Sequence, residues 1–226
     1  MSAPSSSLAS LLARLTDWMP ITEFEKRMRD YFLSDRPRAE VADFRAKRGA
    51  VKPLRDEVAP VLHHVKFVKA KGDIKFALSD TVPDCWLRDT PDAEPRGLEV
   101  TVALSREQHL LGQEMNEKAI GRGFIGLPDA APAKAFADRL AKPRIMYSSA
   151  SPLKAIADGI KSCLKKKAHP KYAGFDLLIE APLHSLPNER WRQVEDELRV
   201  AASLMPFCEI HVIGNQDTEP FGFRIK

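Results

Sequence analysis

Two acidic residues stand in or next to apolar, strand-like segments, where their carboxylates could share one metal ion. Asp84 opens one such segment, and Glu99 lies inside the apolar run LEVTVA. Because successive side chains of a strand alternate between faces, Glu99 shares a face with Thr101 and Ala103. A carboxylate that points into an apolar interior is costly unless it is paired or binds a cation. Two such carboxylates on neighbouring strands therefore predict a site for one divalent ion, Mg²⁺ or Mn²⁺.

A divalent ion between two carboxylates is suited to phosphodiester hydrolysis, because it polarises a phosphate and lowers the pKa of the attacking water. The chain also offers cations for an anionic substrate, in the run KKKAHPKY that follows a predicted helix. These lysines either contact nucleic-acid phosphates or form a solvated helix end, where cations suit the helix dipole. They are Lys165, Lys166, Lys167 and Lys171.

Each candidate acid also has an ordinary structural explanation. Pro-Asp is a common turn pair, so Asp84 could serve only a turn. Glu99 could lie on the wet face of an edge strand, and Thr101 could be present only as a residue that favours strands. Glu57 borders the apolar stripe of a predicted helix, between Leu54 and Val61, so it is either a third acid near the metal or a surface acid.

The order of elements indicates an α/β protein with helices on both sides of a mixed sheet. The three strands predicted at 73–78, 83–87 and 98–103 are joined by short links, which favours antiparallel pairing. Helices separate the third strand from the next one, so that pair can be parallel. The remaining strands are expected at 175–180, 208–213 and 221–225, and the helices at 8–18, 21–32, 37–44, 54–65, 105–119, 132–141, 151–167 and 188–204.

Composition places few limits on function. The chain has 226 residues, 44% hydrophobic and 29% charged, and a net charge of +4 that permits an anionic partner without requiring one. We expect an α/β domain at 51–226 and an N-terminal helical extension at 1–50. No apolar run is long enough to cross a membrane. Three scattered cysteines and the lack of a secretory leader predict a cytoplasmic protein.

The predicted helix, three antiparallel strands, helix and further strand, with PD before the second strand and ExT in the third, resemble the PD-(D/E)XK, or restriction-endonuclease-like, nuclease superfamily. The resemblance covers roughly residues 53–181 and is to a bacterial-type member with ExT in place of ExK. It implies a three-layer restriction-endonuclease-like core and a metal-dependent DNA endonuclease, often a homodimer. Asp84 and Glu99 match the Mg²⁺ (or Mn²⁺) ligands, and Glu57 matches a first-helix helper. Thr101 occupies the position of the lysine that orients or activates water, so Lys165, Lys166, Lys167 and Lys171 are the candidate donors of the missing cation.

The missing lysine also supports an alternative. A threonine cannot stabilise developing negative charge as an ammonium does, so the chain could be a catalytically inactive nuclease-fold module that binds nucleic acid or a protein partner. Such a partner could dock on aromatic residues of the N-terminal helices, although the same residues could simply pack on the core. These aromatic residues are Trp18, Phe24, Tyr31, Phe32 and Phe44.

Overall fold

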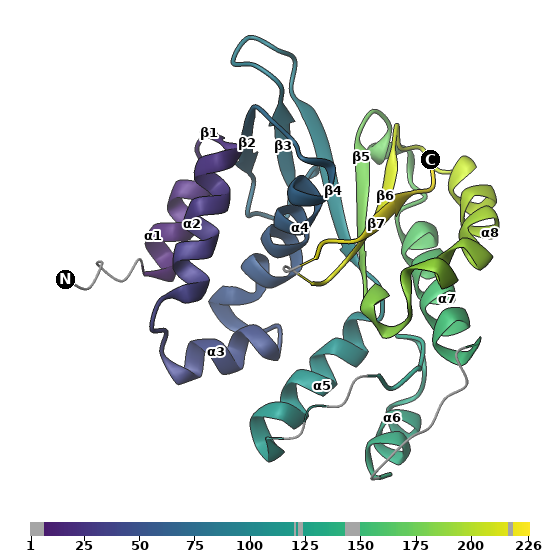
Figure 1. Ribbon diagram of the computed structural model, residues 1–226. Coiled ribbons are helices and arrows are strands. Elements are labelled where there is room, and N and C mark those ends of the chain that lie inside the picture. The colour runs from purple at the N-terminus through teal and green to yellow at the C-terminus, as the bar shows by residue number, and fades with distance from the viewer. Residues whose placement is uncertain (1–6, 120, 122–123, 143–149, 217–218) are drawn as a thin grey trace.

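The protein is built on one open seven-stranded sheet. Figure 1 shows how the strands and helices are arranged in the computed structural model. The structure describes residues 7–119, 121, 124–142, 150–216 and 219–226. The strands lie in the sheet in the same order as in the chain. They are β1 (Met19–Pro20), β2 (Asp73–Phe76), β3 (Cys85–Arg88), β4 (Arg96–Val102), β5 (Asp176–Ala181), β6 (Ile210–Gly214) and β7 (Gly222–Arg224).

Eight α-helices accompany the sheet in the described ranges, and they match the predicted helices to within a few residues at either end. Segment 188–204 begins with a short 3₁₀ turn before α8 starts. The helices are α1 (Leu8–Leu15), α2 (Ile21–Leu33), α3 (Arg38–Arg45), α4 (Ala59–Val68), α5 (Ser105–Lys118), α6 (Ala133–Leu140), α7 (Ala150–Lys166) and α8 (Arg192–Ser203). No helix in these ranges is both long and apolar enough to cross a lipid bilayer.

Strand directions follow from the connections. Strands β1 to β4 pair antiparallel, as the short links between β2, β3 and β4 favour, whereas α2, α3 and α4 lie between β1 and β2. The chain between β4 and β5 carries α5, α6 and α7, so β5 returns parallel to β4, and β6 is parallel to β5. The edge strand β7 is antiparallel to β6. The prediction of an α/β protein with a mixed sheet is confirmed, whereas the short edge strand β1 was not predicted.

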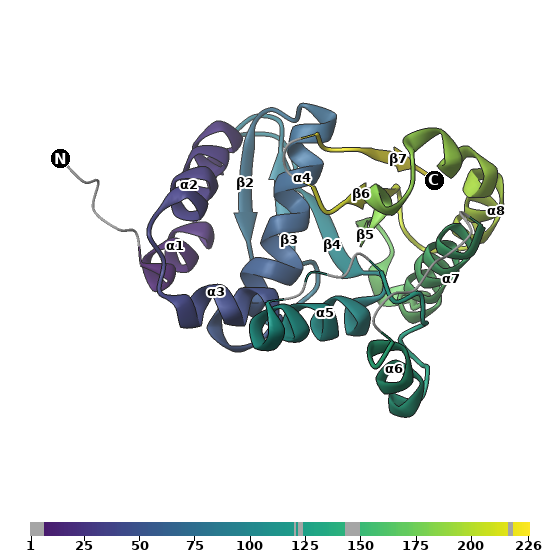
Figure 2. The same ribbon diagram turned by 60° about the horizontal axis from the view of Figure 1, so that its bottom comes forward.

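Helices cover both faces of the sheet (Figures 1 and 2). Leu178 of β5 faces the core that α1, α2 and α4 complete, and its neighbours Leu177 and Ile179 face the core beneath α7 and α8. The described part of segment 1–50 is integral to the first core, because Phe24 and Met28 of α2 are fully buried there.

The aromatic residues of the N-terminal helices are largely engaged within the chain. Phe24 and Tyr31 are buried. Phe32 and Phe44 pack edge to face with a centroid separation of 5.4 Å, and the Arg88 guanidinium lies 4.2 Å from the centroid of the Trp18 ring. These contacts agree with the expectation that the aromatic residues pack on the protein itself.

The helix before β2 has an irregular start that affects the site. Residues Leu54–Val58 form a π-helical segment, in which the Ala59 N–H donates to the Leu54 carbonyl, and α4 continues from it with Pro60 in its first turn. Proline has no N–H and is tolerated in a first turn. The wider π turn changes the direction of side chains relative to a regular helix, and Glu57 lies within it.

Candidate functional site

A pocket of about 320 Å³ opens where the carboxyl end of β4 meets the π-helical segment, the start of β3 and the end of α7. Glu57, Asp84, Thr101 and Lys167 line it, and the Glu99 side chain forms an ion pair with Lys167. The fold therefore brings together the three predicted acids, the threonine and Lys167 of the predicted cluster, and Lys166 also lines the pocket. These five groups come from four segments that are distant in sequence.

Asp84 is fixed to the neighbouring strand by its own side chain. Its Oδ2 accepts a hydrogen bond of 2.6 Å from the Val100 N–H of β4. Burial raises the pKa of Asp84 to about 6, and the Glu99 charge adds to this effect, while the Val100 N–H and Lys167 oppose it. Strand β3 starts one residue after Asp84 rather than at Pro83, so this carboxylate sits at the strand end, directed at β4.

Glu99 is the buried carboxylate that the alternation of β4 predicts. Only 3% of its surface is exposed, and its Oε1 accepts a hydrogen bond from Lys167 Nζ. Burial alone would lower the pKa of Lys167, but the hydrogen bond and the charge of Glu99 outweigh burial, so this pKa is raised. The second oxygen, Oε2, is buried and has no hydrogen-bond partner among the described residues.

Glu57 completes a group of three acids that repel one another. Burial raises its pKa to about 7, followed in size by the charge of Asp84, and the charge of Glu99 contributes as well. Its Oε2 is also buried without a hydrogen-bond partner in the described part of the chain. Perturbed carboxylates that share a pocket are typical of functional sites, because stability alone does not favour them.

Among the four lysines of the predicted cluster, Lys167 is the one that forms an ion pair with a predicted acid. Lys167 pairs with Glu99, whereas Lys165 is exposed. Lys166 Nζ lies 3.8 Å from Asp129 Oδ2, and Lys171 Nζ lies 4.8 Å from the centroid of the Tyr172 ring.

Thr101 of β4 stands where the resemblance to the nuclease superfamily implies a lysine, and it lies next to a cysteine. Its hydroxyl is within hydrogen-bonding reach of the Cys163 thiol of α7. The cation of the site therefore comes from the end of α7 and not from β4.

Asp129 lines the same pocket and was not predicted. Its Oδ1 accepts a 3.0 Å hydrogen bond from the Arg106 N–H at the start of α5, which holds the loop after α5 against the pocket. Glu107 strengthens this attachment by accepting N–H groups of Ile125 and Gly126 at 2.8 and 2.7 Å. A loop acid without periodic neighbours gives no pattern that sequence reasoning could have used.

The donors of this pocket fit a magnesium ion. Mg²⁺ prefers oxygen ligands and usually binds one or two carboxylates together with several waters. Across the described residues, no group of three or more His, Cys, Asp or Glu side chains is placed to hold a metal ion. A magnesium ion here would therefore rest on Asp84, Glu99 and water, and it would satisfy a buried Glu99 oxygen that has no partner.

No protein-family model, curated protein or solved structure matches this chain. The fold and the site together define an α/β protein with an open mixed sheet, in which three mutually repelling acids and one lysine meet at the end of a central strand.

The raised pKa values predict how the stability of the metal-free protein depends on pH. Glu57 and Asp84 titrate near 7 and 6, above their ordinary values of 4.5 and 3.8. Between about pH 4 and 7 the folded protein therefore binds more protons than the unfolded chain, so these two groups make the free energy of unfolding fall as pH rises. Glu57→Gln should raise that free energy at pH 8 by about 1 kcal/mol, after allowance for screening by water.

Urea unfolding at pH 5 and pH 8, with a chelator present, measures this effect. The matched control is Glu117→Gln on the exposed surface of α5, which should leave the difference between the two pH values unchanged. An equal pH dependence in Glu57→Gln and the wild type would show that Glu57 is not destabilised by its neighbours.

Proposed function

We propose that this protein is a magnesium-dependent nuclease with a restriction-endonuclease-like core, and that it hydrolyses phosphodiester bonds in DNA. The observation that carries the proposal is that Glu57, Asp84 and Lys167 line one pocket and that Lys167 pairs with Glu99, although these residues lie up to 110 positions apart. The element order of a helix, three antiparallel strands, helices and a parallel strand supports the same conclusion.

Each side chain has a distinct role in this proposal. Asp84 and Glu99 would hold the metal ion, which when bound polarises the scissile phosphate and lowers the pKa of the attacking water. Glu57, with a pKa near 7, would accept the proton that the water loses. Lys167 supplies the positive charge that Thr101 cannot, and it stabilises negative charge that develops on the phosphate.

The DNA strand would enter over the end of α7. Lys166 lines the pocket, and Lys171, like Lys167, lies near the Tyr172 ring. Both Lys166 and Lys171 would contact phosphates on either side of the scissile bond. Lys165 is exposed next to them. Such contacts position the backbone without reading base sequence, so this part of the surface favours binding that is independent of sequence.

A cleavage assay tests the proposal. Purified protein is incubated with linear, circular and single-stranded DNA in Mg²⁺, Mn²⁺ or chelator, next to Glu99→Ala and Asp84→Asn. We expect metal-dependent cutting by the wild type and a loss of about 100-fold or more in both variants, provided that circular dichroism shows them folded. Cutting that survives in both folded variants would overturn the assignment of the site.

An inactive nuclease-fold module is the second candidate function. The observation in its favour is that Lys167 already neutralises Glu99, which leaves the acid paired without a metal. The two candidates differ in metal binding: a nuclease site should raise the melting temperature in 10 mM Mg²⁺ relative to matched ionic strength, since a ligand of the folded state stabilises it. The absence of both a shift and cleavage by the wild type would favour the inactive module.

A further inference from the structure

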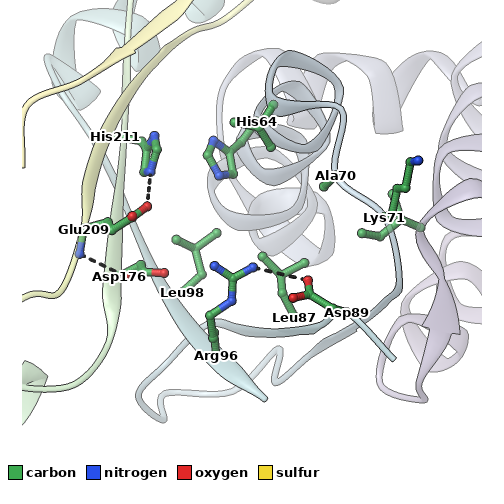
Figure 3. A pocket seen from close by; sticks show the side chains of 12 residues that line it. His64, Ala70, Lys71, Leu87, Asp89, Arg96, Leu98, Asp176, Glu209 and His211 are labelled. Carbon is green, nitrogen blue, oxygen red and sulfur yellow. Dashed lines mark hydrogen bonds and ion pairs between the residues drawn. The ribbon is translucent and has the colours of Figure 1, made fainter. Parts of the chain in front are cut away.

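A second pocket lies at the opposite ends of the same strands (Figure 3). It measures about 270 Å³ and is lined by the starts of β4, β5 and β6, the end of β3 and the carboxyl end of α4. The first pocket, which Glu57, Asp84 and Lys167 line, lies instead at the carboxyl end of β4 and before the start of β3. The second pocket shares no lining residue with it, so its chemistry is a separate question.

The pocket contains a buried histidine with one ring nitrogen that has no hydrogen-bond partner in the described part of the chain. His64 of α4 is 7% exposed, and its Nδ1 is buried without a hydrogen-bond partner among the described residues. Its ring lies 4.8 Å from the ring of His211, measured between centroids, and Figure 3 shows it directed into the space bounded by His211 and Leu98. A buried polar atom without a partner costs free energy that a bound ligand could recover.

The carboxylates around the pocket are already engaged. Glu209 accepts hydrogen bonds of 3.0 Å from His211 Nε2 and from Arg224 Nη1. Asp176 Oδ1 accepts the Glu209 N–H at 3.0 Å.

At the outer rim, Asp89 Oδ1 lies 3.6 Å from Arg96 Nη2, and both side chains are largely exposed. Each of the three carboxylates is thus already in contact with a cationic side chain, an imidazole or a backbone N–H group.

The pocket also has donors that no contact among the described residues uses up. Arg96 carries five N–H groups, of which the contact with Asp89 uses a small part. Lys71 projects from the opposite rim (Figure 3). A neutral imidazole has one N–H that either ring nitrogen can carry, so His64 can donate from Nδ1 to an acceptor in the pocket. Between these donors the lining is apolar, with Val68, Leu87 and Leu98.

We propose that this pocket binds a small organic oxyanion, in which a phosphate or carboxylate group accepts hydrogen bonds from His64 and Arg96 and the apolar part lies against Leu87 and Leu98. The pocket volume is near the lower limit for small-molecule sites, which suits a compact ligand and not a polymer. Lys71 adds positive charge at the rim. The proposal does not rest on the nuclease function, because the two pockets are lined by different residues.

Thermal unfolding with two probes tests the proposal. Full-length protein in chelator and without DNA is melted with 10 mM inorganic phosphate or 10 mM succinate, against sodium chloride of equal ionic strength. For a dissociation constant near 1 mM, the melting temperature should rise by roughly 3–6 °C. Which probe stabilises the protein distinguishes a phosphate source from a carboxylate source.

Two variants locate the binding. Arg96→Gln alters a side chain that is 60% exposed and should fold normally, and it should lose most of the stabilisation, as should His64→Leu if folded. His184→Leu, an exposed histidine outside this pocket, should keep all of it. The Nδ1 resonance of His64 in histidine-labelled protein should also shift with the probe. No stabilisation of the wild type by either probe, or equal stabilisation of Arg96→Gln, would overturn the proposal.

Discussion

Replacement of Lys167 by methionine is expected to reduce metal-dependent DNA cleavage by about 100- to 1,000-fold. A preorganised charge next to a reacting phosphate contributes an effect of this size when it is removed. Lys167 is the lysine of the KKKAHPKY run that contacts Glu99. Methionine keeps most of the length of the side chain and removes only the charge.

Single-turnover cleavage at saturating protein measures the chemical step apart from DNA binding. The matched control is Lys165→Met, which removes an exposed lysine from the same helix end and should alter the rate by less than a factor of three. Because Lys167→Met leaves Glu99 buried without its cation, a thermal melt must show that the variant is folded. A rate for Lys167→Met equal to that of Lys165→Met would refute the role of Lys167 in cleavage.

Replacement of Arg55 by leucine is expected to lower the free energy of unfolding by about 3–5 kcal/mol, because it leaves a buried charge without its cation. Glu180 of β5 is fully buried, and both of its oxygens accept hydrogen bonds from Arg55 Nη1, at 3.2 and 3.0 Å. Arg55 Nη2 donates to Gln108 Oε1 at 2.9 Å, so the same guanidinium ties the π-helical segment to α5 and to the sheet.

Urea unfolding of three variants separates the charge effect from lost packing. The double variant Arg55→Leu/Glu180→Leu should recover a large part of the loss, since it removes both charges. Arg199→Leu, which breaks an exposed ion pair with Glu195 on α8, should cost less than about 1 kcal/mol. If Arg55→Leu costs no more than Arg199→Leu, the buried ion pair does not stabilise the fold as its geometry suggests.

Local patterns in the sequence were sufficient for the central strands and their acids. The alternation of LEVTVA predicts that Glu99 lies on a buried face, and the structure leaves it 3% exposed. The short links between β2, β3 and β4 require antiparallel pairing, and the helices that follow permit β5 to be parallel. Strand alternation and link length depend on residues that are close in the chain, so a single sequence is enough to predict both.

The tertiary structure alone decided which charges meet. Lys165, Lys166 and Lys167 are equivalent as a charge run, and only the orientation of the end of α7 against β4 directs Lys167 to Glu99. Lys47 follows α3 with no apolar pattern around it, yet it is buried with its Nζ 2.8 Å from Asp56 Oδ1.

Asp129 joins the pocket because backbone groups of α5 hold its loop in place. Spacing along a chain fixes which residues share a face of one helix or strand. It does not fix the rotation and distance of one element relative to another, which depend on packing across the whole core.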